Sequence, residues 1–139
     1  MFKTVLVPVD VSIPDDTQTI LSSAKTLTAP WACALHVVTV VPDMGMAIVG
    51  SYFDKGFEKE SRDRAMQELQ QAAGTAGIDA ELHVLSGTIY DRVLALAGKI
   101  SADLIVLRAH SPQLGDYLLG SNAARVVRHA SQSVMVLRN

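Results

Sequence analysis

The sequence contains few of the residues that define several classes of protein. It has one cysteine, one tryptophan and five prolines among 139 residues. A single thiol cannot form a disulfide within the chain or build a zinc cluster alone, so we interpret Cys33 as a buried, inert thiol in a reducing cytoplasm. The small number of prolines and glycines excludes collagen-like and low-complexity chains.

No charge of one sign dominates, and no long apolar run is present. Twelve basic and 14 acidic residues give a formal net charge of −2. Because nucleic-acid-binding surfaces usually carry a basic surplus, we expect no nucleic acid partner. No window reaches the roughly 18 apolar residues of a membrane span, and the N-terminus lacks the pattern of a signal peptide, so we expect no membrane partner.

What remains is a chain rich in apolar residues. Hydrophobic residues make up 49% of the sequence and charged residues 19%, a balance that excludes intrinsic disorder. The length predicts one domain over residues 1–139, and the apolar surplus predicts a core together with a subunit interface.

Short apolar runs alternate with longer amphipathic stretches. Strands are predicted at residues 4–9, 34–41, 80–85, 104–107 and 134–137. Helices are predicted up to about residue 27 and at 54–76, 88–100 and 120–130, with long loops at 43–53 and 108–119. This alternation is typical of an α/β fold in which helices cover both faces of a parallel sheet. Two strand orders fit, 3-2-1-4-5 and 2-1-3-4-5, and in both a ligand binds at the carboxyl ends of the strands that flank the reversal.

Local signals predict the ends and faces of the helices. Ser12 and Thr88 offer capping hydroxyls, Pro14 suits a first helical turn, and Gly77 suits a C-terminal cap. Helical spacing predicts two inward faces, formed by Phe57, Ala65, Met66, Leu69, Ala72, Ala73 and Ala76 in the long helix, and by Ile89, Val93, Leu94, Ala97 and Ile100 in the next one.

In the strand order 3-2-1-4-5, the candidate binding residues lie in the loops after strands one and four. Asp10 could accept hydrogen bonds from a ribose or a base, or it could satisfy backbone N–H groups at the helix start; both readings stay open. Gly120 and Ser121 open a helix whose first N–H groups could hold a phosphate, but from these two residues alone ordinary N-capping by Ser121 is the favoured interpretation. No P-loop and no G-x-G-x-x-G fingerprint is present.

The histidines give no metal-ligand spacing in the sequence. His36 and His83 fall within predicted strands, so we interpret them as structural residues. His110 follows strand four and is the best functional candidate of the four histidines. Ser121 has no visible base, so no catalytic residue is assigned.

Several segments together resemble the universal stress protein (UspA-like) family. They are residues 5–10 (VLVPVD), 102–107 (ADLIVL), 118–124 (LLGSNAA), 127–130 (VRHA) and 133–138 (SVMVLR). The resemblance implies a three-layer α/β/α domain with strand order 3-2-1-4-5, which is Rossmann-like and similar to the adenine nucleotide alpha hydrolases. The shortened loop before Gly120 resembles the UspF/UspG-like branch.

The resemblance also implies a binding site for ATP, or for ADP or AMP, with Mg²⁺ possible beside the nucleotide. Adenine and ribose would contact strand ends, the phosphates would lie on the last helix, and no metal ligand is implied. The implied residues are Pro8, Val9, Asp10, Val40, Leu107, Arg108, His110, Ser111, Gly120, Ser121, Asn122 and Ala123.

The sequence departs from the family's nucleotide motif, G-x2-G-x9-G-[ST]. Arg108 and Ser111 replace its first two glycines, and eight residues separate Ser111 from Gly120. An arginine at 108 could block the site or contact the phosphates.

The family also pairs its last strand, Val134 to Leu137, across a homodimer, and tetramers are possible. An apolar edge strand favours such pairing. The expected function is a cytoplasmic stress-response regulator with at most slow hydrolysis; the alternatives are a true ATP hydrolase and a nucleotide-independent dimeric interaction module.

Overall fold

The computed structural model describes residues 1–42, 51–109 and 120–138, with the side chains of the second helix described from residue 56 onward. Five strands and four α-helices alternate along these residues. The strands are β1 (Thr4–Pro8), β2 (Ala34–Val41), β3 (Glu81–Ser86), β4 (Leu104–Arg108) and β5 (Ser133–Leu137). The helices are α1 (Pro14–Thr28), α2 (Ser51–Ala76), α3 (Ile89–Lys99) and α4 (Ser121–His129), and a short 3-10 turn, η1 (Ala29–Trp31), follows α1.

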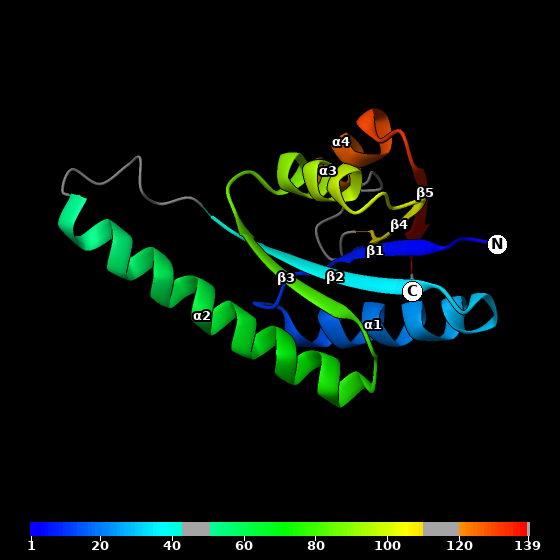
Figure 1. Ribbon diagram of the computed structural model, residues 1–139, viewed down its shortest axis with the longest axis horizontal. Helices are drawn as coiled ribbons and strands as arrows, with labels where there is room; N and C mark the ends of the chain where they lie inside the picture. The colour runs from blue at the N-terminus through cyan, green and yellow to red at the C-terminus, as the bar shows by residue number, and fades with distance from the viewer. Residues whose placement is uncertain (43–50, 110–119, 139) are drawn as a thin grey trace.

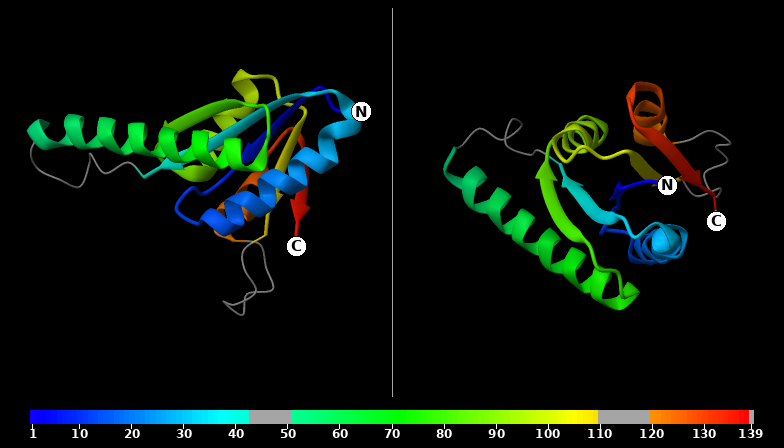
Figure 2. Two further views of the ribbon diagram at one scale, coloured as in Figure 1. Left: turned by 90° about the horizontal axis from the view of Figure 1, so that it is seen from below. Right: turned by 45° about the vertical axis from the view of Figure 1, so that its right-hand side comes forward.

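The strands form one parallel sheet in the order β3-β2-β1-β4-β5. This confirms the predicted α/β fold with order 3-2-1-4-5 and excludes the order 2-1-3-4-5. Helices α1 and α2 cover one face of the sheet, and α3 and α4 cover the other (Figure 1, Figure 2). The direction of winding therefore reverses between β1 and β4, where such folds bind ligands.

The core consists of two apolar layers, because alternate residues of each strand point to opposite faces. Val5, Val7, Val37 and Val106 pack under α1 and α2, together with Leu69 of α2. Leu6, Val38, Ile105 and Leu107 pack under α3 and α4. The central strands are buried on both sides, which explains why they read as continuous apolar runs in the sequence.

The two ends of the sheet differ in how tightly β1 and β4 are joined. β1 pairs with β2 from Thr4 to Pro8, but it pairs with β4 only at Val5 and Leu6. At the amino end, the Asp103 carboxylate accepts the backbone N–H groups of Lys3 and Thr4 at 2.9 and 3.0 Å. The backbone N–H of Asp103 in turn donates to the Thr4 carbonyl at 2.9 Å. The strands are therefore joined at their starts and free of ladder pairing at their carboxyl ends.

Several local predictions were wrong. Residues 51–53 belong to α2 rather than to the preceding loop. The N-cap of α1 is Ile13 and that of α3 is Thr88, and neither N-cap residue forms a capping hydrogen bond through its own side chain within the described residues. Phe57 and Ile89 are 52% and 43% exposed rather than inward. Phe57 is the seventh residue of α2 and Ile89 is the first residue of α3, so both lie near the start of a helix, where the helical periodicity of the sequence continues although neither side chain is covered.

Other local predictions are confirmed. Strand β2 has the predicted bounds, and Gly77 ends α2 with a φ of +65°, a conformation that favours glycine. No helix in the described ranges is both long enough and apolar enough to cross a membrane.

Candidate functional site

A cavity of about 880 Å³ lies at the carboxyl ends of the strands, where β1 and β4 separate. This volume falls within the roughly 300–1,000 Å³ of typical small-molecule sites. Ten of the predicted site residues line the cavity: Pro8, Val9, Asp10, Val40, Leu107, Arg108, Gly120, Ser121, Asn122 and Ala123. The other two, His110 and Ser111, lie outside the described residues. The fold thus brings together residues 8–10, 107–108 and 120–123 with Val40 of β2, as the predicted site requires.

Asp10 is exposed at the rim of the cavity, and its backbone builds the turn into α1. Its Oδ1 accepts the Ser12 backbone N–H at 3.0 Å and the Ser12 hydroxyl at 2.5 Å. Its carbonyl oxygen accepts the Thr17 hydroxyl at 2.6 Å and the Ile13 N–H at 3.1 Å. Asp10 therefore satisfies a backbone N–H, which was one of its two predicted roles. This role does not exclude the other, in which Asp10 accepts hydrogen bonds from a ribose or a base, because the carboxylate has two oxygens.

The first turn of α4 lines the cavity. The helix begins at Ser121, with Gly120 as the N-cap, and no side-chain capping hydrogen bond occurs there within the described residues. Ser121 therefore does not cap the helix, which removes the simpler reading of this Gly-Ser pair. The first N–H groups of a helix lack acceptors inside it and carry the positive end of its dipole, so they can hold an anion.

Asn122 connects the starts of α3 and α4. Its side-chain Oδ1 accepts the backbone N–H of Tyr90 at 3.3 Å, in the first turn of α3. This contact supplies part of the capping that the Thr88 hydroxyl was predicted to give. The guanidinium of Arg125 lies over the Tyr90 ring at 4.9 Å, so Arg125 stacks on α3 rather than lining the cavity. Both contacts fix the position of the α4 N-terminus above the sheet.

Arg108 extends toward the start of α1. Its guanidinium forms an ion pair and hydrogen bond with the carboxylate of Asp16. The side chain is 22% exposed, and both residues line the cavity. The arginine that replaces a glycine of the family motif is therefore held inside the cavity wall by an acid from the first turn of α1.

One wall of the cavity was not predicted from the sequence. Helix α2 extends past the carboxyl ends of the strands (Figure 1, Figure 2), and Ser61, Arg64 and Glu68 line the cavity from it. The sequence pattern assigned Arg and Glu of this helix to a solvent face. The length of α2 was the one feature of the sequence that could have predicted this wall. Its 26 residues span about 39 Å, far more than the adjacent strands β2 and β3, which have eight and six residues.

Together, the fold and the cavity define a class of protein. The chain is a doubly wound parallel α/β protein with an open ligand cavity at the reversal of strand order, and a helix N-terminus faces that cavity. The match of residues 1–138 to the family model described as "Universal stress protein family" narrows the class. The chain belongs to the universal stress protein family.

The most similar relatives include two bacterial proteins of one name. The chain is 31% identical to Universal stress protein G of Escherichia coli O157:H7, over 99% of this chain and 100% of that protein. It is 32% identical, with the same coverage, to Universal stress protein G of Salmonella typhimurium. These matches agree with the UspF/UspG-like branch suggested by the sequence.

Solved structures share the fold. A universal stress protein in complex with cAMP is 20% identical with a TM-score of 0.69, over 99% of this chain and 97% of that one. A universal stress protein of Archaeoglobus fulgidus in complex with dAMP is 20% identical with a TM-score of 0.62, over 96% of both chains. At this identity the likeness shows a common fold.

Proposed function

We propose that this chain binds ATP, or the related nucleotides ADP or AMP, in the cavity and acts as a cytoplasmic, homodimeric stress-response regulator. The observation that carries the proposal is the first turn of α4, which has no side-chain cap among the residues that the structure describes and lines a cavity with apolar walls at the reversal of strand order. Two family members of the same fold are known in complex with adenine nucleotides, cAMP and dAMP, which supports the choice of ligand class.

The cavity offers different surfaces to the two halves of a nucleotide. Val9, Val40 and Leu107 give apolar walls suited to adenine, and Asp10 stands beside them as a hydrogen-bond acceptor for the ribose or the base. The backbone N–H groups at Gly120, Ser121, Asn122 and Ala123 would hold the phosphates. Mg²⁺ would accompany a triphosphate and neutralise part of its charge.

Arg108 would assist binding rather than block it. The cavity keeps about 880 Å³ with the Arg108 side chain in place, so the arginine forms a wall and does not fill the space. Its side chain is 22% exposed, and its guanidinium is already held by the Asp16 carboxylate. Because the Arg108 guanidinium is already held in place, little free energy would be spent on ordering it when it contacts the outer phosphates of ATP.

Hydrolysis would be slow. The sequence has no P-loop lysine, and the Asp10 carboxylate is held by Ser12 through Oδ1. Most phosphoryl-transfer catalysis comes from positioning groups of these kinds. Steady phosphate release from ATP that is abolished in His110→Ala would replace this proposal with a true ATP hydrolase. Release that no cavity substitution changes would indicate a contaminating enzyme.

The dimer would form along β5, which is the edge strand beside β4. Val136 is half-buried and belongs to neither apolar core layer, so a lysine there should leave the fold intact. Pairing of two β5 edges would cover it. In sedimentation velocity, the wild type should be a dimer, Val136→Lys a monomer, and the control Val127→Lys, on exposed α4 surface, a dimer. A wild-type monomer would contradict the homodimer.

Calorimetric titration with ATP and Mg²⁺, ADP and AMP tests the nucleotide proposal, together with the nucleotide content of the purified protein. We expect saturable heat for at least one of the three and adenine absorbance in the released small molecules. Protein that purifies without nucleotide and gives no heat at high concentration would contradict the proposal. That result would favour the nucleotide-independent interaction module.

A further inference from the structure

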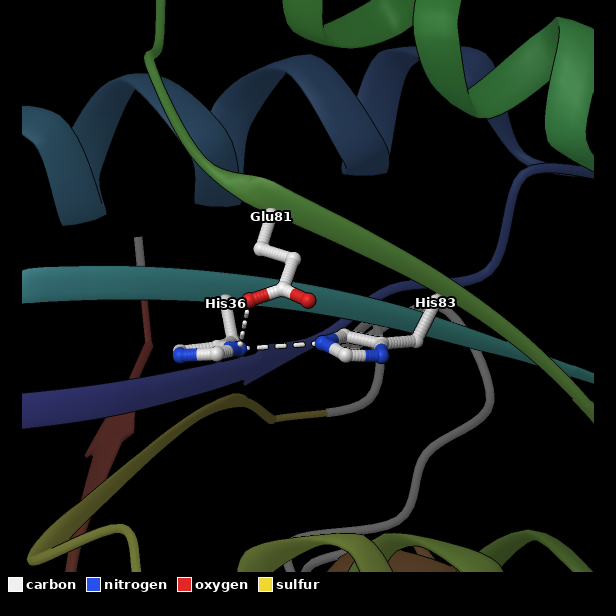
Figure 3. Close-up of side chains that lie close together, drawn as sticks. All are labelled: His36, Glu81 and His83. Atoms are coloured by element: carbon white, nitrogen blue, oxygen red, sulfur yellow. Dashed lines mark hydrogen bonds and ion pairs between the residues drawn. The ribbon is translucent and has the colours of Figure 1, made fainter. Parts of the chain in front are cut away.

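Three titratable side chains meet at the opposite end of the sheet from the cavity. His36 lies on β2, while Glu81 and His83 lie on the neighbouring edge strand β3 (Figure 3). The Nδ1 atom of His36 lies 2.9 Å from Nε2 of His83 and 3.5 Å from Oε2 of Glu81. These three atoms all lie within 4.8 Å of one another.

Strand register brings the three residues together. His36 is paired with Glu81, and His83 is two residues further along β3, so all three side chains leave the same face of the sheet. Val38 and Val40 of β2 point to this face as well, under α3 and α4. His36 and the cavity residue Val40 are four residues apart on one strand, or about 13 Å, so this cluster is separate from the nucleotide cavity.

We propose that His36, Glu81 and His83 bind a divalent first-row transition metal, for which Zn²⁺ is the representative ion. Two imidazole nitrogens and a carboxylate oxygen are a ligand set that zinc uses with water in the fourth position. Zinc–ligand bonds of about 2.0–2.1 Å place tetrahedral ligand atoms roughly 3.3 Å apart. The separations of 2.9 and 3.5 Å from His36 Nδ1 are close to this value, and the third pair of ligand atoms lies within 4.8 Å, so the exposed Glu81 side chain would supply the remaining adjustment.

The surroundings of the cluster suit such an ion. The His36 side chain is 12% exposed, whereas the Glu81 side chain is 69% exposed, so a rigid, half-buried pair of nitrogens has an open path to solvent. The histidine rings stack with centroids 5.2 Å apart and 17° between their planes. The imidazole groups favour zinc, nickel or copper over Mg²⁺, which prefers oxygen ligands.

The charges around the cluster act in both directions. Burial lowers the pKa of His83, the charges of His36 and Lys99 lower it further, and the Glu81 carboxylate raises it. The Lys99 ammonium, in the last turn of α3, therefore opposes a bound cation, and Glu81 compensates. A bound ion would join β2 to the edge strand β3, which otherwise depends on its ladder with β2 and its packing against α2.

Zn²⁺ binding by the full chain is the test. Protein treated with EDTA and dialysed is titrated with Zn²⁺ against a chromogenic chelator, and separately with Co²⁺ to record the visible absorption of a tetrahedral site. We expect one Zn²⁺ per chain, a tetrahedral Co²⁺ spectrum, and a higher melting temperature with Zn²⁺.

Single substitutions locate the site. His36→Gln and His83→Gln should each weaken Zn²⁺ binding more than about 100-fold, and Glu81→Gln about tenfold. Because the Glu81 side chain is 69% exposed, its substitution should change the stability of the fold little, which keeps the test valid if a histidine variant folds poorly. Lys99→Gln should bind Zn²⁺ as tightly as the wild type or more tightly. The matched control is His129→Gln, on the exposed surface of α4, which should bind Zn²⁺ like the wild type.

Three results would overturn the proposal: no Zn²⁺ binding by the wild type, one Zn²⁺ shared by two chains, or binding that survives in His36→Gln and His83→Gln. None of these measurements involves nucleotide, so the metal site and the nucleotide site can fail independently.

Discussion

The two ends of the sheet are built for different tasks. At the amino end, Asp103 joins the starts of β1 and β4 through hydrogen bonds to Lys3 and Thr4. At the carboxyl end, the same strands lose their ladder after Leu6 and Ile105, and a cavity takes the place of the missing pairs. One parallel sheet thus has an end where β1 and β4 are held together and an end where they separate around a cavity.

The two ends also differ in what their polar groups contact. Asp103 is satisfied by backbone N–H groups of its own chain. At the carboxyl end, the first N–H groups of α4 have no side-chain cap within the described residues. Substitutions at the carboxyl end should therefore change ligand binding, and those at the amino end should change stability.

The largest expected effect is at Gly120. Its φ of −53° and ψ of 155° are accessible to any residue, so Gly120→Val should fold normally while placing a branched side chain over the α4 N-terminus. Loss of two charge-assisted N–H contacts, at about 1.5–3 kcal/mol each, should weaken ATP binding at least about 100-fold by calorimetry. Gly74→Val is the matched control, because a Cβ there meets nothing within 4 Å and Gly74 lies outside the cavity. Equal affinity in the two variants would remove α4 from the site.

An intermediate effect is expected at Arg108. Arg108→Ala should weaken ATP about tenfold, because one charged contact to the outer phosphates is lost. AMP lacks those phosphates, so its affinity should change less than about threefold. Parallel titrations with the two nucleotides measure the difference. If Arg108→Ala binds ATP more tightly than the wild type, Arg108 obstructs the cavity.

The smallest effect is expected at the amino end, in Asp103→Ala. Removing a half-buried acceptor of two N–H groups should lower the free energy of unfolding by about 1 kcal/mol and the melting temperature by roughly 3–5 °C. ATP affinity should not change. The exposed acid Asp79 provides the control, Asp79→Ala, which should leave the melting temperature within about 1 °C of the wild type.

The Asp103 contribution also has a defined pH dependence. The N–H groups of Lys3 and Thr4 lower the pKa of Asp103 below its ordinary value of 3.8. The folded state therefore favours the ionised carboxylate, and this stabilisation is complete above that value and is lost as the pH falls below it. Thermal melts of the wild type and Asp103→Ala should converge in acid. A gap that stays constant down to the lowest pH would contradict this assignment.

The fold class and the loops around the cavity were predictable from local patterns in the sequence, whereas most individual cavity residues came from the family resemblance. Apolar β-branched runs predict buried strands, and the ends of such strands in a parallel sheet predict where a ligand binds. Asp10 and Gly120 could be located in this way although they are 110 positions apart. The strand order itself came from the resemblance, since alternation of elements left two orders open.

Contacts that depend on register and helix tilt were not predictable. His36 and His83 were assigned structural roles because each was considered on its own strand. Their proximity depends on the pairing of His36 with Glu81 across β2 and β3. Arg64 and Glu68 were missed since the angle of α2 to the sheet is set by packing at Leu69 and Ala73 rather than by a local signal. The partner of Arg108, Asp16, also follows from tertiary structure alone.

The most direct measurement of the central claim is a nitrogen–proton correlation spectrum of the labelled protein during titration with ATP. The backbone N–H signals of Ser121, Asn122 and Ala123 should shift progressively and saturate, together with those of Val9 and Asp10. The signals of His36, Glu81 and His83 should stay in place. An unchanged spectrum, or shifts concentrated at the amino end of the sheet while the α4 signals do not move, would contradict the account.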